Sequence, residues 1–241
     1  MNWHTRYLQQ AAWTRDLRKY LFERAGLGCS NRILEVGCGT GAILSEIPRP
    51  VSLHGLDLDA VALAECRIHA PDASLTRADG HHPPYPDQSF DIAYCHYLLL
   101  WAKDPLQVIK EMARVSRHII AFAEPDYSRR VDEPAGLKTL GIFQTESLRR
   151  QGANPSFGGM LADTFHRAGI QIVETGPIQG QDVMRSTSDW ENEWDVIETD
   201  LQSVAAVEEI QKLKKLDKAA RKKGERVLRI STFFAWGKSE V

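Results

Sequence analysis

The sequence Arg32-Ile-Leu-Glu-Val-Gly-Cys-Gly-Thr-Gly-Ala-Ile43 contains the most informative pattern in this chain. Apolar residues with strand character come first, glycine then occupies every second position, and an apolar helical spacing begins at Ile43. We therefore predict a strand, a tight glycine turn and a helix in immediate succession. Glycine suits such a turn because it reaches positive φ angles and leaves the backbone open to a ligand. A helix that begins there also offers free N–H groups.

Taken alone, the glycine pattern is compatible with two kinds of cofactor site. Gly37, Gly39 and Ala42 satisfy the G-x-G-x-x-G/A pattern of dinucleotide-binding proteins, so an NAD- or FAD-binding site remains open. Asp57 follows a second predicted strand over 51–56. A carboxylate at that position can accept hydrogen bonds from both hydroxyls of a ribose, in either kind of site. Asp57 therefore indicates that the ligand contains a ribose, but it does not distinguish a dinucleotide from another ribose-containing cofactor.

The motifs around the glycine turn resemble those of the class I, Rossmann-like S-adenosylmethionine (SAM)-dependent methyltransferases. The resembling stretches are Glu35 with the glycine turn, Gly55-Leu-Asp-Leu-Asp59, Arg77-Ala-Asp-Gly80 and Ser89-Phe-Asp-Ile-Ala-Tyr-Cys-His96. The resemblance covers roughly residues 30–125. It implies an α/β fold with a seven-stranded, mostly parallel sheet and a C-terminal antiparallel strand. It also implies SAM as the cofactor and S-adenosylhomocysteine (SAH) as the product.

The implied cofactor site lies at the carboxyl ends of the strands, where open parallel sheets bind their ligands. We expect Asp79 to accept a hydrogen bond from the adenine amino group. Arg6 and its neighbours on a leading helix are candidates to meet the methionine carboxylate or the adenosine. The residues expected at the cofactor are Tyr7, Gln10, Trp13, Glu35, Gly37, Cys38, Gly39, Gly41, Asp57, Leu58, Asp79, Gly80, Cys95 and His96.

Methyl transfer from a sulfonium needs alignment and exclusion of water more than it needs acid catalysis, because a neutral thioether leaves. A base is required only when the attacking atom of the acceptor carries a proton. His96 is the candidate base, and a histidine that merely packs beside the cofactor is an equal alternative. Tyr127 is the second catalytic candidate. The residues expected at the acceptor are Tyr97, Trp101, Glu124 and Asp126, of which the two carboxylates would suit a cationic amine.

The chain is expected to form one domain over residues 1–241. A leading helix over 3–25 precedes the first strand, and two helical insertions at about 128–155 and 185–224 are expected to form a cap over the carboxyl edge of the sheet. The further strands are predicted at 73–77, 90–95, 118–123, 170–175 and 227–236.

Composition excludes several classes of function. The net charge of −2 argues against a nucleic-acid binder, and the basic run over 212–223 is interpreted as a solvated helix face. No apolar run reaches the ~18–20 residues of a membrane span, and the first residues do not resemble a signal peptide, so we expect a cytoplasmic protein without membrane contact. The four cysteines and the paired His81 and His82 lack metal-ligand spacing, so no metal is predicted.

The sequence thus predicts a methyltransferase for a small-molecule acceptor, as a monomer or homodimer. Two alternatives stay open: a SAM-binding protein that does not methylate, acting as a sensor or through other sulfonium chemistry, and an NAD(P)-dependent oxidoreductase. Methylation of RNA or protein would need a wide basic or extended groove, and the near-neutral charge weighs against it.

Overall fold

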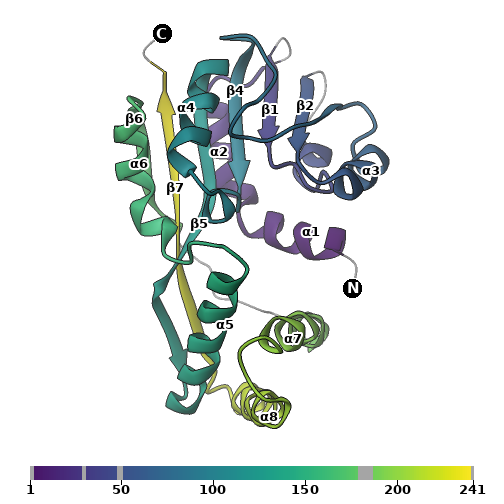
Figure 1. The fold of residues 1–241 in the computed structure, drawn as a ribbon, viewed down its shortest axis with the longest axis vertical. Coiled ribbons are helices and arrows are strands. Elements are labelled where there is room, and N and C mark those ends of the chain that lie inside the picture. The colour runs from purple at the N-terminus through teal and green to yellow at the C-terminus, as the bar shows by residue number, and fades with distance from the viewer. Residues whose placement is uncertain (1–2, 29–30, 48–50, 179–186, 240–241) are drawn as a thin grey trace.

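A computed structural model describes residues 3–28, 31–47, 51–178 and 187–239, without the side chains of 187–189, 191 and 192. Its centre is a seven-stranded sheet with the order β3-β2-β1-β4-β5-β7-β6 (Figure 1). The strands are β1 (Arg32–Val36), β2 (Ser52–Asp57), β3 (Ser74–Arg77), β4 (Phe90–His96), β5 (Ser116–Glu133), β6 (Gln171–Pro177) and β7 (Val227–Lys238). Strand β7 is antiparallel to β5 and β6, and the other neighbours are parallel. The predicted sheet is confirmed, and its order differs from the 3-2-1-4-5-6 order of dinucleotide-binding folds.

Helices cover both faces of the sheet, and the alternation of side chains along the strands explains why. Ile33 belongs to the buried cluster under α1, α2 and α3, whereas its neighbour Leu34 belongs to the cluster under α4 and α6. The helices are α1 (Trp3–Trp13), α2 (Arg15–Arg24), α3 (Ala60–His69), α4 (Pro105–Val115), α5 (Lys138–Arg150), α6 (Leu161–Arg167), α7 (Thr187–Leu201) and α8 (Val207–Lys222). In the described part of the chain, no helix has the length and apolar character that crossing a membrane requires.

Two local predictions differ from the structure. The helix predicted over 3–25 is interrupted at Thr14, because the side chains of Thr14 and Arg18 both donate hydrogen bonds to the carbonyl oxygen of Ala11. The helix predicted after the glycine turn is only a 3₁₀ turn, η1 (Leu44–Glu46). The N–H groups of Gly37 and Cys38 in the turn are bonded to the carbonyl oxygen of Leu56, and that of Gly39 is bonded to Asp57.

Strands β5 and β7 extend well beyond the rest of the sheet and form a two-stranded arm. Strand β5 was predicted to end near residue 123, but it continues to Glu133, paired with Val227 of β7. The pairing shifts in register between Ala121 and Glu124 and again between Asp126 and Val131. These irregularities let the arm bend away from the sheet.

The arm carries the two helical insertions, which lie together at one end of the molecule (Figure 1). Helix α5 contacts α7, and α7 contacts α8. They enclose a buried cluster of their own, separate from the two clusters of the sheet, that includes Leu140, Trp190, Trp194, Ile197 and Leu213. We call α5, α7 and α8 the cap.

Buried ion pairs fasten the cap to the arm. Arg226 at the start of β7 donates from Nη2 to Asp132 Oδ1 at 2.7 Å and from Nε to Asp217 Oδ1 at 2.6 Å. Asp217 on α8 also accepts hydrogen bonds from the indole N–H groups of Trp190 and Trp194. Since these carboxylates and Arg226 are almost completely buried, each charge depends on its partners.

Candidate functional site

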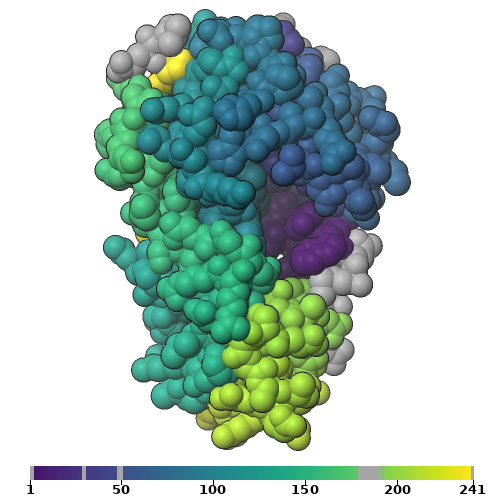
Figure 2. All heavy atoms as spheres, in the orientation of Figure 1, coloured from purple at the N-terminus to yellow at the C-terminus, as the bar shows by residue number. Residues whose placement is uncertain are grey.

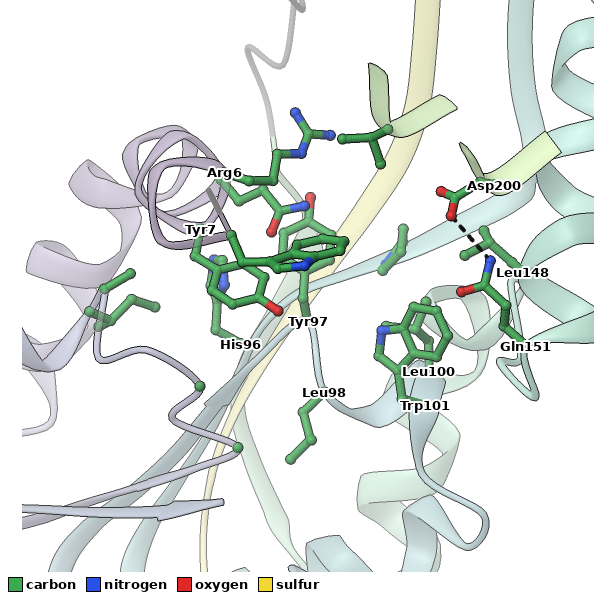
Figure 3. A pocket seen from close by; sticks show the side chains of 18 of the residues that line it. Arg6, Tyr7, His96, Tyr97, Leu98, Leu100, Trp101, Leu148, Gln151 and Asp200 are labelled. Atoms are coloured by element: carbon green, nitrogen blue, oxygen red, sulfur yellow. Dashed lines mark hydrogen bonds between the residues drawn. The ribbon is translucent and has the colours of Figure 1, made fainter. Parts of the chain in front are cut away.

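A cavity of about 530 Å³ lies where α1, the glycine turn and the cap meet. Figure 2 shows this face of the molecule hollowed beside the purple N-terminal helix, below the blue segments. Figure 3 shows the interior: Arg6 and Tyr7 lie on the α1 side, Trp101 and Asp200 lie opposite, and His96, Tyr97 and Leu98 lie between them. We call the first side the cofactor half and the opposite side the acceptor half.

The glycine turn builds the floor of the cofactor half. Gly37, Gly39 and Gly41 all have positive φ angles of 74°, 50° and 79°. A Cβ atom at Gly39 would lie 3.5 Å from the ring of Tyr7, so a side chain there would enter the space between the turn and α1. Asp57 anchors the turn, because its Oδ2 accepts the N–H of Gly39 at 2.7 Å. The bare turn and the adjoining carboxylate fit an adenosine-type cofactor.

Helix α1 forms the wall above this floor. Tyr7 and Gln10 line the cavity as predicted for the cofactor site, and Trp3 and Arg6 line it as well. Trp13 does not line it, because its ring lies on the outside with the Arg6 guanidinium 5.8 Å from the ring centroid. His4 fastens the helix to the turn through a 2.8 Å hydrogen bond to Thr40 Oγ1.

His96 lies between the two halves of the cavity at the end of β4. Its Nε2 is 3.0 Å from Thr14 Oγ1, which also accepts a hydrogen bond from Arg18 and donates its own proton to Ala11 O. With the single hydroxyl proton of Thr14 directed to Ala11 O, Nε2 of His96 is the donor to Thr14 and Nδ1 is the acceptor. Burial, with the charge of Arg18, lowers the pKa of His96 to about 3. The ring is therefore neutral and weakly basic.

Glu35 lies under the glycine turn and is almost fully buried. Burial raises the pKa of its carboxyl to about 8, although the 2.9 Å hydrogen bond from the hydroxyl of Tyr94 opposes the shift. At neutral pH the carboxyl is mostly protonated. Glu35 lines the cavity as a polar, neutral group.

Tyr97, Trp101 and Tyr127 line the cavity, which places three of the aromatic candidates together. Tyr97 has a positive φ of 54°, a strained conformation for a residue with a side chain. Burial raises the pKa values of Tyr97 and Tyr127, so both phenols keep their protons at neutral pH.

The two carboxylates predicted at the acceptor lie outside the cavity and are already bonded within the protein. Glu124 is fully buried and accepts the backbone N–H groups of Leu98, Leu99 and Leu100 at 3.0–3.1 Å, at the start of η2 (Leu99–Trp101). Asp126 accepts hydrogen bonds from the backbone and hydroxyl of Ser128. The geometry therefore does not bring them to an acceptor, and Glu124 instead holds the segment that presents Trp101.

Other predicted cofactor residues surround the cavity without lining it. Gly41 faces Cys66, and Cys95 is fully buried. Leu58 is exposed beyond Asp57 at the same edge. Asp79 accepts hydrogen bonds from the backbone and the ring of His81, and Gly80 packs on Val36. Cys38 lies in the glycine turn and does line the cavity.

Comparison with known proteins agrees with this arrangement. A family model described as a methyltransferase domain matches residues 34–118, which include the glycine turn, Asp57 and His96. Residues 34–118 therefore match the methyltransferase domain family. A malonyl-[acyl-carrier protein] O-methyltransferase of Halorhodospira halophila is 33% identical to this chain over 119 residues, covering 46% of this chain and 40% of the relative. The chain thus spans less than half the length of that relative.

Solved methyltransferase structures share the fold of the whole chain. A Bacillus halodurans protein assigned as a methyltransferase superposes with a TM-score of 0.67 over 92% of this chain and 98% of its own, at 14% identity. Geranyl diphosphate C-methyltransferase of Streptomyces coelicolor, in complex with Mg²⁺, geranyl diphosphate and SAH, superposes with a TM-score of 0.58 over 93% of this chain and 79% of its own, at 9% identity.

The acceptor half of the cavity consists of residues that the sequence motifs do not cover. They are Leu100, Gln144, Leu148, Gln151, Glu193, Val196, Ile197 and Asp200. The helical spacing on α7 could have indicated three of these residues. Glu193, Val196 and Asp200 each precede a buried residue of the cap cluster, so they lie together on the face of α7 next to its buried face. Among the described residues, no group of three or more His, Cys, Asp or Glu side chains has the arrangement of a metal site.

Proposed function

We propose that this protein transfers the methyl group of SAM to a small-molecule acceptor held beneath the cap. The observation that carries the proposal is the continuity of one cavity from Gly39 and Asp57 in the cofactor half to Asp200 in the acceptor half. A cavity of about 530 Å³ is within the range of enclosed small-molecule sites. The near-neutral net charge also favours a small acceptor over RNA.

On the cofactor side, Asp57 would bind the ribose hydroxyls, and the bare backbone of the glycine turn would support the nucleoside. Tyr7, Gln10 and Arg6 of α1 would close over it, and Arg6 supplies a cation for the methionine carboxylate. SAM, when bound, supplies an electrophilic methyl group on a sulfonium. The neutral Glu35 adds no charge beneath the turn.

The residues between the two halves would align the acceptor rather than activate it strongly. His96 is a weak base, but the lone pair on Nδ1 can accept a hydrogen bond from an acceptor N–H or O–H group. Tyr97 and Tyr127 can donate hydrogen bonds because their phenols stay protonated. The cap would shield the bound ligands from water, and alignment in a dry site can lower a barrier by about 7–11 kcal/mol.

Calorimetric titration with SAM, SAH and NADPH tests the cofactor. We expect SAM and SAH to bind, and Asp57→Ala to abolish their binding. Asp59→Ala is the matched control, because Asp59 is the neighbouring carboxylate and caps α3 without lining the cavity. Binding of NADPH alone would overturn the proposal in favour of an oxidoreductase.

Transfer is tested by measuring SAH formation from SAM with three separate additions: a low-molecular-mass metabolite extract, total RNA and total protein. We expect SAH to accumulate with the metabolite extract only. Accumulation with RNA or protein would contradict the small-molecule assignment. Tight SAM binding without transfer to any fraction would favour a SAM-binding protein that does not methylate.

A further inference from the structure

The acceptor half of the cavity is acidic. Glu193 and Asp200 both come from α7 and line the cavity. They are seven residues apart, which is two helical turns, so their side chains lie on one face of the helix. Among the described residues that line the cavity, Arg6 is the one Lys or Arg side chain, and it comes from α1 on the cofactor side.

Glu193 has a buried oxygen without a partner. Its Oε2 is inaccessible to water and makes no hydrogen bond within the described part of the chain. An acid on the same helix behaves differently: Glu198 is paired with Lys214 at 3.0 Å and accepts a hydrogen bond from Gln211 at 2.8 Å. A buried carboxylate oxygen without a partner is costly, so Glu193 is suited to a ligand that supplies a donor.

Asp200 is a second, better solvated acid on the same wall. Its Oδ1 accepts a long hydrogen bond of 3.5 Å from Gln151, and Figure 3 shows the carboxylate beside Gln151 at the edge of the acceptor half. Burial raises the pKa values of Glu193 and Asp200, and the positive charge of Arg6 only partly opposes the shift at each acid. A cationic ligand would stabilise the ionised form of both.

The remaining wall of the acceptor half is apolar and aromatic. Leu100, Leu148 and Ile197 line it, together with the rings of Trp101 and Tyr127. Such a wall accommodates an apolar body, and aromatic faces also attract a cation. The ligand that matches both features is an amine whose ammonium group is attached to an apolar or aromatic framework.

We propose that the methyl acceptor is a cationic amine on an apolar framework, and that Glu193, supported by Asp200, binds its ammonium group. This assignment rests on the proposed methyltransferase function and deepens it by naming the substrate class. Arg6 would then bind the carboxylate of the cofactor, and the acids of α7 would bind the ammonium group of the acceptor. The positive charge comes from α1 and the negative charges come from α7.

The test uses the full-length protein saturated with SAH and calorimetric titration with matched probe pairs. The probes are benzylamine, 2-phenylethylamine, 3-phenylpropylamine and 4-phenylbutylamine, each beside the alcohol of the same chain length. We expect at least one amine to bind about tenfold or more tightly than its alcohol, as charge-assisted hydrogen bonding predicts. Glu193→Gln should reduce that preference to about threefold or less, and Asp200→Asn should reduce it by a smaller factor.

Asp195→Asn is the matched control, because it removes one negative charge from the exposed face of the same helix. It should keep the preference for the amine. Equal affinity for every amine and its alcohol, an unchanged preference in Glu193→Gln, or an equal loss in Asp195→Asn would each overturn the proposal. SAH affinity is measured first, so that failure of the proposed function can be told apart from failure of this inference. If SAH does not bind, both the proposed function and this inference are wrong. If SAH binds and no amine is preferred over its alcohol, only this inference is wrong.

Discussion

The Thr14 hydroxyl lies 3.0 Å from Nε2 of His96 and joins the N-terminal helices to the carboxyl end of β4. Thr14 is also the residue at which α1 and α2 separate. The position of α1 above the glycine turn and the orientation of the His96 ring are therefore parts of one arrangement.

His96 is expected to remain neutral from about pH 5 to pH 8, because burial lowers its pKa to about 3. Nitrogen-15 NMR of the histidine rings should show one unchanging signal pair for His96, with the proton on Nε2. The same ring in the urea-unfolded chain should titrate near ~6.5 and provides the reference. A native-state titration near neutrality, or a proton on Nδ1, would contradict the hydrogen-bond assignment to Thr14.

Glu35→Gln is expected to stabilise the protein increasingly as the pH rises. Burial raises the pKa of Glu35 from 4.5 to about 8, so its contribution to stability is full below about pH 4.5 and is lost as the pH rises to 8. The loss amounts to a few kcal/mol, at about 1.36 kcal/mol per pKa unit. Urea unfolding at a series of pH values measures it.

The glutamine variant should remove that part of the pH dependence. Glu23→Gln on the exposed side of α2 is the control and should follow the wild-type curve. Parallel curves for wild type and Glu35→Gln would show that Glu35 ionises at its ordinary pH in the folded protein.

Glu124→Gln is expected to weaken the segment that carries Trp101. Both carboxylate oxygens of Glu124 accept backbone N–H groups, and an amide nitrogen cannot replace either of them. We expect a loss of about 1–3 kcal/mol in the free energy of unfolding. Hydrogen exchange should rise at Leu99 and Leu100, while SAH affinity stays the same. Unchanged exchange at these amides would refute the positioning role.

Asp217→Asn is expected to destabilise the cap, because it leaves buried Arg226 with one carboxylate partner fewer. Loss of a buried ion pair costs about 3–5 kcal/mol, measured here as hydrogen exchange in α7 and α8. SAH binding, which we propose to occur at the sheet edge, should change little. Glu225→Gln, an exposed acid beside Arg226, should cost less than about 0.5 kcal/mol. An equal loss in both variants would contradict the role of the buried network.

The sheet could be predicted from the sequence because its signals are local. The apolar strands, the glycine turn and Asp57 each carry their meaning in a few consecutive residues. The extension of β5 could not be predicted in this way, since Pro125 and the charged residues that follow it resemble a loop. Only pairing with β7, more than 90 residues later in the chain, makes that segment a strand.

The cofactor half of the site was largely predictable, and the acceptor half was not. Gly37, Gly39 and Asp57 belong to motifs with fixed spacing, so the fold places them together by necessity. Glu193 and Asp200 belong to an insertion whose position depends on the arm and on the buried pairs of Asp217. The break at Thr14 was missed for a similar reason, because side-chain bonds to Ala11 override the helical pattern.

The separate cluster of buried side chains inside the cap has an evolutionary consequence. Since Trp194 and Leu213 pack among cap residues and not against the sheet, substitutions there leave the packing around the glycine turn intact. Related chains can therefore differ in the acceptor half while the glycine turn and Asp57 stay the same. The arm of β5 and β7 separates the packing of the cap from the packing of the sheet.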